Sequence, residues 1–178
     1  RCNTNEIAHA LIKKFGSFSA VLNAPMEELV QVEGMGETSA VLLKMIPELC
    51  AYYLDSSIEP GIILDSTLKA GEFFLPKFFG KQNEEMHLAA LDDKHKIIRS
   101  TCMAEAVSSN ATGIILAHNH PGGLALPSLN DRKVTRLAFH ALRLINVALL
   151  DHLIIADGDF VSMADSGYLQ MIRDEAGY

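Results

Sequence analysis

The run from Gly113 to Ala117 is entirely apolar and leads directly into His118 and His120. An apolar run of this length, rich in β-branched isoleucine, is typical of a strand that is buried on both faces. Alternate residues of an extended chain point to the same side, so these two histidines can direct both imidazoles to one point at the strand end. The sequence therefore predicts a sheet domain that carries a two-histidine site.

Helical and extended patterns alternate around this strand, which favours an α/β (α+β) domain. Residues 128–144 have apolar side chains at helical spacing, and Asp157-Gly158 is a hairpin signal. Pro76 is expected to end the helix that precedes it. The expected helices are Ser66–Leu75, Ala104–Ser109 and Ser128–Leu144, and the expected strands are Leu88–Leu91, Ile97–Ile98, Gly113–Ala117, Val147–Ala156 and Phe160–Met163.

The N-terminal third has only helical patterns and reads as a separate, small all-α domain. Gly34 and Gly36 allow a tight hairpin whose backbone N–H groups point outward before the next helix, which is an anion site in principle. Helical periodicity stops after Tyr53, so we expect domains at 1–57 and 58–178. The expected N-terminal helices are Glu6–Phe15, Ser19–Ala24, Met26–Gln31 and Thr38–Leu49.

The composition favours one cellular compartment and disfavours some classes of binding partner. The chain has 15 Lys and Arg against 22 Asp and Glu, a net charge of −7, and this charge disfavours tight binding of phosphate backbones. Three scattered cysteines argue against a disulfide framework and favour reduced thiols. No apolar run is long enough for a membrane span, and the first residues do not resemble a signal peptide. A cytoplasmic location is the default expectation.

Asp131 lies in the first turn of the helix that follows the two histidines, where its carboxylate can meet them. Two His nitrogens and one carboxylate, with a fourth position left to water, have the composition of a catalytic zinc site, and imidazole ligands argue against magnesium or calcium. Two plainer interpretations remain open. The histidines can form a hydrogen-bonded pair, and Ser128 with Asp131 has the spacing of a capping box, which is compatible with a ligand role.

These residues resemble a known motif. His118, His120, Ser128 and Asp131 match the JAMM motif of the MPN (JAB) metallopeptidase-like domains. The sequence His-Asn-His-Pro-x-Gly, with Asp-His-Leu-Ile-Ile at 151–155, resembles the RadC branch, whose members are named as DNA repair proteins. Residues 15–18 and 27–36 are similar to the helix-hairpin-helix region that precedes the JAMM domain in RadC.

The resemblance implies a cytidine-deaminase-like mixed sheet flanked by helices, with zinc held by His118, His120 and Asp131. It also implies a zinc-bound water that attacks an amide bond of a peptide or protein substrate, with Ser128 bonded to that water or to the oxyanion. The general base would be a glutamate at a strand start, and Glu84 aligns better than Glu85. The functional expectation is a zinc metallopeptidase-like hydrolase.

Three departures from the family pattern bear on this expectation. The segment between Ile98 and Ala104 is too short for the strand and turn that RadC proteins usually have there, so either these are deleted here or residues are missing from the sequence. Acidic side chains flank the hairpin, and Lys44 is the only basic residue near it, so only weak DNA contact through residues 32–38 is expected. The motif loop at residues 123–126 is unusually apolar, and it shapes a substrate groove or simply packs.

Two noncatalytic alternatives remain: a DNA-repair-associated accessory protein with a regulatory zinc site, and a scaffold. The sequence identifies neither a physiological substrate nor an oligomeric state.

Among the other ionisable residues, Asp151 and His152 lie within an apolar strand, so we expect them to form a hydrogen bond to the loop that carries the candidate metal ligands. The remaining histidines in regular patterns are expected to pack or to lie on the surface: His9, His87 and His140.

Overall fold

The computed structural model describes residues 4–56, 61–101 and 111–177. The chain divides into two compact units, Arg1–Tyr53 and Leu54–Tyr178, whereas the sequence places the boundary at residue 57. The expected helix Ala104–Ser109 lies outside the described residues. Within the described ranges, no helix combines the length and the apolar character that a bilayer span requires.

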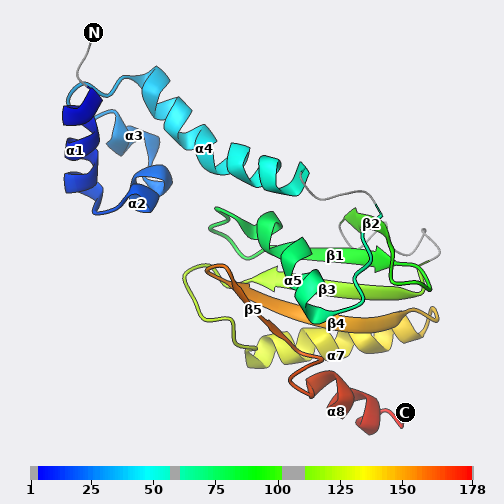
Figure 1. The fold of residues 1–178 in the computed structure, drawn as a ribbon. Helices are drawn as coiled ribbons and strands as arrows, with labels where there is room; N and C mark the ends of the chain where they lie inside the picture. The colour runs from blue at the N-terminus through cyan, green and yellow to red at the C-terminus, as the bar shows by residue number, and fades with distance from the viewer. Residues whose placement is uncertain (1–3, 57–60, 102–110, 178) are drawn as a thin grey trace. The chain divides into compact units, whose positions relative to one another are not determined.

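The N-terminal unit consists of helices around a small apolar core (Figure 1). Ser17 begins the second helix, because its Oγ accepts a hydrogen bond from the backbone N–H of Ala20. Pro25 lies at the N-cap of the third helix. The helices are α1 (Thr4–Phe15), α2 (Phe18–Asn23), α3 (Met26–Leu29) and α4 (Glu37–Ser56). The buried core residues are Leu11, Val21, Ala24, Leu29, Val32 and Ala40.

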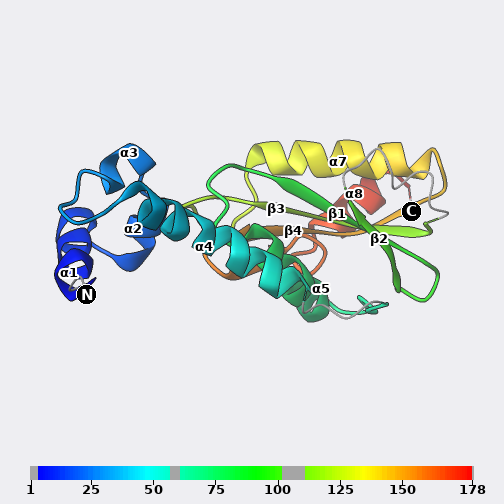
Figure 2. The same ribbon diagram turned by 90° about the horizontal axis from the view of Figure 1, so that it is seen from above.

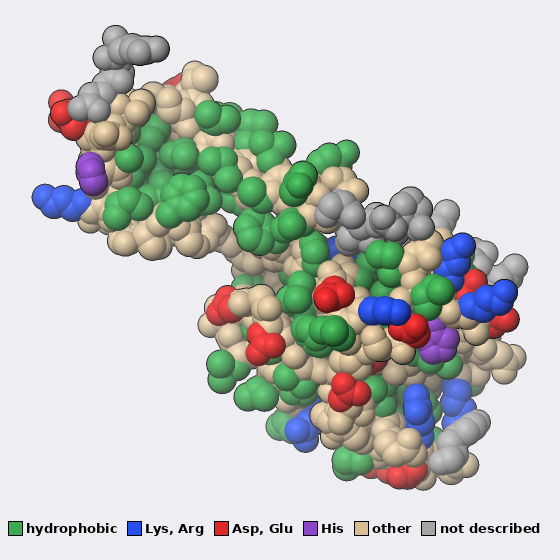
Figure 3. Space-filling model, in the orientation of Figure 1, with side chains coloured by type: hydrophobic (Ala, Val, Ile, Leu, Met, Phe, Trp, Pro, Cys, Tyr) green, Lys and Arg blue, Asp and Glu red, His purple; other side chains and the backbone are tan. Residues whose placement is uncertain are grey.

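Helix α4 is longer than the sequence pattern predicts, and the expected end at Leu49 is wrong. Exposed apolar side chains continue at helical spacing past that point, from Val41 through Met45 and Leu49 to Tyr52. Asp and Ser in a last helical turn cost only a few tenths of a kcal/mol each, so Asp55 and Ser56 do not stop the helix. Figure 3 shows hydrophobic side chains gathered on the visible face of this unit.

The second unit is built on a five-stranded mixed sheet with the strand order β2-β1-β3-β4-β5. β3 and β4 are parallel, and the other neighbours are antiparallel. The predicted mixed α/β architecture is therefore confirmed for this unit. The strands are β1 (Met86–Leu91), β2 (Ile97–Thr101), β3 (Gly113–Asn119), β4 (Ala148–Ala156) and β5 (Asp159–Ser162).

Helices cover both faces of the sheet, as Figures 1 and 2 show. Helix α5 (Thr67–Phe74) and the 3-10 helix η1 (Leu75–Phe78) pack on one face, with Pro76 at the start of η1. Helices α7 (Leu129–Arg143) and α8 (Tyr168–Glu175) pack on the other. The sequence patterns do not predict α8, because its two buried residues form a single i,i+3 pair, which is a weak signal.

The alternation of side chains along β3 determines where its histidine points. Ile115 and Ala117 join the core under α5, whereas Ile114 and Leu116 join the core under α7. His118 continues the second series, so it faces α7. All seven residues of β3 are buried, as the apolar run predicts. A polar side chain at this position is therefore held rigidly, but it must be hydrogen-bonded or bound to a metal.

Replacement of Gly71 by alanine tests the packing of α5 against the sheet. A Cβ at Gly71 would lie 2.2 Å from the Phe160 ring. We expect Gly71→Ala to reduce the free energy of unfolding by about 1–3 kcal/mol, because overpacking exceeds the gain in helix propensity. Urea unfolding measures this, and adding Phe160→Leu should restore part of the loss. A single variant as stable as the parent would contradict the packing described here.

Candidate metal centre

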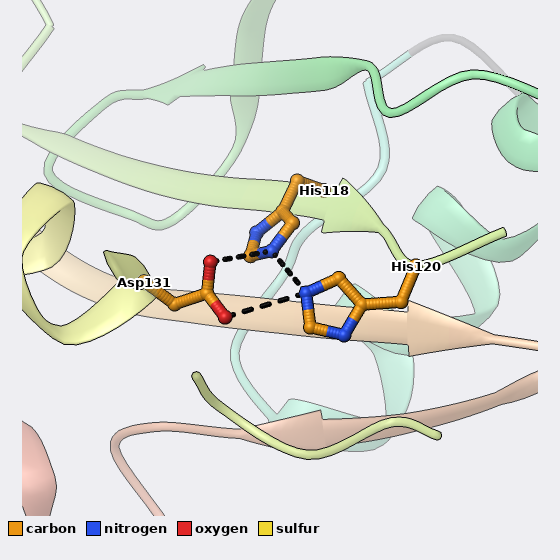
Figure 4. A group of neighbouring side chains, drawn as sticks. All are labelled: His118, His120 and Asp131. Carbon is orange, nitrogen blue, oxygen red and sulfur yellow. Dashed lines mark hydrogen bonds and ion pairs between the residues drawn. The ribbon is translucent and has the colours of Figure 1, made fainter. Parts of the chain in front are cut away.

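Three side chains converge at the carboxyl end of β3 (Figure 4): His118 from the strand, His120 from the loop directly after it, and Asp131 from α7. His118 Nε2 lies 3.0 Å from Asp131 Oδ1, and His120 Nε2 lies 3.3 Å from Asp131 Oδ2. The two Nε2 atoms are 3.0 Å apart. The structure thus brings together the three residues that the sequence proposes as metal ligands.

Asp131 is positioned by the start of α7. The backbone N–H of Asp131 donates to Ser128 Oγ at 3.1 Å, and the backbone N–H of Ser128 donates to Asp131 Oδ2 at 2.6 Å. This is the capping box that the spacing predicts, and the same carboxylate also faces both histidines. Burial opposes ionisation of Asp131, but the hydrogen bonds from Ser128 and the nearby imidazoles hold its pKa below the ordinary value. The carboxylate is therefore charged at neutral pH.

His120 is oriented by the loop that follows it. Its Nδ1 lies 3.1 Å from the backbone carbonyl oxygen of Leu124. A carbonyl only accepts, so Nδ1 carries the ring proton, and in the neutral imidazole Nε2 presents a lone pair to Asp131. Leu124 and Leu126 are 73% and 61% exposed, so this apolar loop does not pack its leucines into the core.

The donor set fits a metal ion. Zinc–nitrogen and zinc–oxygen bonds of about 2.0–2.1 Å in tetrahedral geometry place ligand atoms about 3.3 Å apart. The two Nε2 atoms are 3.0 Å apart, close to this value, and the ligand atoms offered by the three residues, one from each, all lie within 4.8 Å of one another. Since His120 Nε2 and the carboxylate oxygens are all electron-pair donors, a cation between them removes their mutual repulsion.

Behind the ligands, a buried polar chain leads from His118 into the interior. His118 Nδ1 lies 2.8 Å from His152 Nε2, and His152 Nδ1 lies 2.7 Å from Thr135 Oγ1. Burial lowers the pKa of His118 and lowers that of His152 to about 3, so His152 is neutral. The expected hydrogen bond from His152 to the metal site is confirmed. Thr135 was not among the residues expected at this site, although its position one turn after Asp131 on α7 marks the same helix face.

Asp151 does not contact the metal site, so that part of the expectation is wrong. Its carboxylate accepts hydrogen bonds from the Ser162 hydroxyl at 2.6 Å and from the backbone N–H groups of His152 and Ala164. Burial raises its pKa despite these three donors. Asp151 pairs with Ile115 across the parallel strands and therefore faces α5, whereas His152 pairs with Leu116 and faces α7.

The two candidate bases lie on opposite faces of the sheet. Met86 is the strand partner of His118, so the side-chain alternation puts Glu84 on the α7 side and Glu85 on the other. Glu84 is exposed, and its charge acts on His118. The Glu85 carboxylate instead lies 3.4 Å from His87 Nε2 and 3.4 Å from Lys81 Nζ.

Asn119 is a second buried polar residue at this site that was not among the expected ones. Its buried side chain accepts a hydrogen bond from the Glu85 N–H at 2.7 Å and donates to the Asn83 carbonyl oxygen at 3.0 Å. The two bonds bracket Glu84 and hold its backbone against the end of β3. An Asn between two histidines, directly after an apolar run, is the sequence signal that could have identified it, because a polar side chain buried there needs hydrogen-bond partners.

The remaining residues of interest lie away from this centre. His9 and His140 are exposed, and the His87 ring contacts Phe78. In the N-terminal unit, Lys44 Nζ donates to the backbone carbonyl oxygens of Leu22 and Ala24 at 2.9 and 3.1 Å. This contact directs the ammonium group to the protein itself. The weak DNA contact through residues 32–38 stays a prediction.

Comparison with known proteins gives consistent relatives. A family model described as a RadC-like JAB domain matches residues 100–168. A UPF0758 protein of Tolumonas auensis is 34% identical to this chain, and UPF0758 proteins of Vibrio parahaemolyticus and Vibrio cholerae are 32% and 31% identical. Each comparison covers 94% of this chain and 82% of the relative.

The alignments also bear on chain length. They extend over 183 or 184 positions, more than the 178 residues of this chain, so the relatives contain internal residues that have no counterpart here. The sequence predicts such a shortening between Ile98 and Ala104, and its position stays a prediction.

Metal content tests the centre directly. Protein purified without chelators should contain close to stoichiometric metal by elemental analysis, and the double variant His118→Ala, His120→Ala should contain almost none, because one carboxylate is an insufficient ligand set. The matched control is His9→Ala, His140→Ala, which replaces two exposed histidines. Wild-type protein that holds no metal and cannot be loaded at neutral pH would contradict the assignment.

Stability of the metal-free protein should fall in mild acid. The folded-state pKa of His152 is about 3, below its ordinary value of 6.5, so the unfolded chain takes up this proton first as the pH falls. One such group costs about 1.4 kcal/mol of unfolding free energy per pH unit below 6.5, and His118 acts in the same direction.

Urea unfolding between pH 6.5 and 5 measures this slope. His152→Gln should reduce it, whereas His140→Gln, at an exposed position on α7, should leave it unchanged. Equal slopes in the wild type and in His152→Gln would contradict the neutral, buried state of His152.

Proposed function

The chain belongs to the RadC family, and from that premise we propose that it is a zinc-dependent hydrolase of the JAMM metallopeptidase type, which cleaves an amide bond in a peptide or protein substrate. The observation that carries the proposal is the convergence of His118, His120 and Asp131 beside an acidic side chain on the same face of the sheet. A ligand set with a carboxylate next to it has the parts that metal-assisted amide hydrolysis requires.

The donor set supports zinc as the metal. Imidazole nitrogens are poor ligands for magnesium and calcium, and two of them with one carboxylate are typical of catalytic zinc sites that keep a fourth position open. A bound zinc ion would lower the pKa of a coordinated water toward neutrality and polarise the substrate carbonyl.

Glu84 is the residue proposed to move the proton. It is exposed two residues before β1, on the face of His118, so its carboxylate can accept a proton from the attacking water and deliver it to the leaving amine. Asn119 fixes the backbone on either side of it, which limits the directions the carboxylate can take.

Ser128 has a proposed role that is compatible with its cap. Its Oγ accepts from the backbone N–H of Asp131, which uses a lone pair and leaves the hydroxyl proton for another acceptor. Ser128 is exposed and directly precedes α7, so this proton can be donated to an oxyanion that forms on the substrate.

A matched pair of variants tests the proposal. Zinc-loaded protein is incubated with a mixture of synthetic peptides, and cleavage is followed by mass spectrometry. Glu84→Gln should bind zinc like the wild type but lose cleavage by about 10²–10⁴-fold, because the proton acceptor is gone. Glu85→Gln changes the neighbouring carboxylate on the opposite face and should retain activity.

Two results would count against the hydrolase. The first is a Glu84→Gln protein that cleaves as fast as the wild type. The second is a zinc-loaded wild type that cleaves no peptide or protein offered to it.

A further inference from the structure

Three consecutive contacts link the metal centre to the interior of the second unit. His118 Nδ1 lies 2.8 Å from His152 Nε2, and His152 Nδ1 lies 2.7 Å from Thr135 Oγ1. Thr135 Oγ1 in turn lies 2.6 Å from the backbone carbonyl oxygen of Asp131. Thr135 and His152 are completely buried, so no solvent water competes for these contacts.

The last contact sets the direction of the others. A carbonyl oxygen cannot donate, so at 2.6 Å the single proton of the Thr135 hydroxyl must lie between the two oxygens. The other neighbour of this hydroxyl, Met163 Sδ at 3.2 Å, is a weak acceptor and does not compete. Thr135 Oγ1 therefore faces His152 Nδ1 as an acceptor, and Nδ1 must carry the ring proton.

The direction then passes from His152 to His118. A fully buried imidazole without a carboxylate in contact is neutral and has one ring proton, so His152 Nε2 presents a lone pair. His118 Nδ1 must donate to that lone pair. The remaining nitrogen of His118, Nε2, is then the one that faces His120 and Asp131 and is the ring nitrogen left for a metal.

We propose that Thr135 and His152 are positioning residues that fix His118 in the tautomer with the proton on Nδ1, so that Nε2 is a metal ligand before any metal arrives. The proposal deepens the proposed function and rests on it only for the use of the metal. If the chain of hydrogen bonds ran the other way, His118 Nε2 would carry a proton and donate it to Asp131. The site would then be closed by a hydrogen bond instead of open to a cation.

The chain also couples the ligands to each other. The carbonyl that orients the hydroxyl of Thr135 belongs to Asp131, whose carboxylate is itself a proposed ligand. A displacement of α7 would therefore disturb both the carboxylate and the tautomer of His118. Threonine is suited to this position, because a hydroxyl accepts one proton and donates another.

The direct test is ¹⁵N NMR of the imidazole rings in metal-free wild-type protein at neutral pH. Long-range ¹⁵N–¹H correlations distinguish a protonated from an unprotonated ring nitrogen. We expect both His118 and His152 to carry the proton on Nδ1. A proton on Nε2 of either ring would overturn the proposal, whatever the protein is found to hydrolyse.

Two substitutions at one position provide the matched comparison. Thr135→Val keeps the shape but removes the acceptor, so His152 should move its proton to Nε2 and His118 should follow. We expect zinc affinity, measured by competition with a chelator, to fall about 10–100-fold. Thr135→Ser keeps the hydroxyl and should restore both the tautomers and the affinity.

Folding and function are separated by the same experiments. Circular dichroism and urea unfolding show whether each variant is folded, and the wild-type spectrum alone tests the proposal if Thr135→Val is not. A folded Thr135→Val protein with wild-type tautomers and zinc affinity would overturn the inference. If the tautomers are as expected but no peptide is cleaved, only the proposed hydrolase activity fails.

Discussion

The second unit depends on the burial of β3 between two layers of helices. Every residue of this strand is shielded from solvent, so each side chain is held on one of two faces. The face toward α7 carries Ile114, Leu116 and then His118, and the apolar part of this series stabilises the polar end by fixing it in place. Burying a polar side chain in such a strand costs several kcal/mol unless its hydrogen-bonding groups are satisfied. Around the candidate metal centre, His152 is the hydrogen-bond partner of the His118 Nδ1 atom.

Among the described residues, no buried side-chain nitrogen or oxygen lacks a partner. Behind the candidate ligands, His118 Nδ1, His152 and Thr135 satisfy one another in sequence, and their hydrogen bonds join β3, β4 and α7. In a medium of low dielectric constant such a chain is stable only when it is complete, because one missing partner leaves a buried group unpaired. The same completeness that stabilises the fold therefore also sets the orientation of the ligands.

Much of this centre could be predicted from short stretches of sequence. The two-residue spacing of His118 and His120 at the end of β3, and the place of Asp131 in the first turn of the next helix, depend on local geometry alone, and the structure brings these three residues together. The partners of the second layer depend on strand pairing. The register of β3 against β4 shifts between Ile114 and Ile115, and such a shift exchanges the faces of all later residues. For this reason the sequence could not show that His152 faces the metal centre while Asp151 faces away.

The choice between Glu84 and Glu85 has the same physical origin. Adjacent residues entering a strand differ only in the face to which they point, and a sequence that contains both carboxylates does not specify which one faces the ligands. Pairing of Met86 with His118 decides which carboxylate faces the ligands. Paired residues of an antiparallel ladder point to the same face, and the alternation along the chain then gives Glu84 the same face as Met86. Asn119 keeps Glu84 on this face where the ladder ends, because its side chain forms hydrogen bonds to the backbone on both sides of Glu84. A residue between two candidate metal ligands thus positions the proposed base through the backbone, without contact between their side chains.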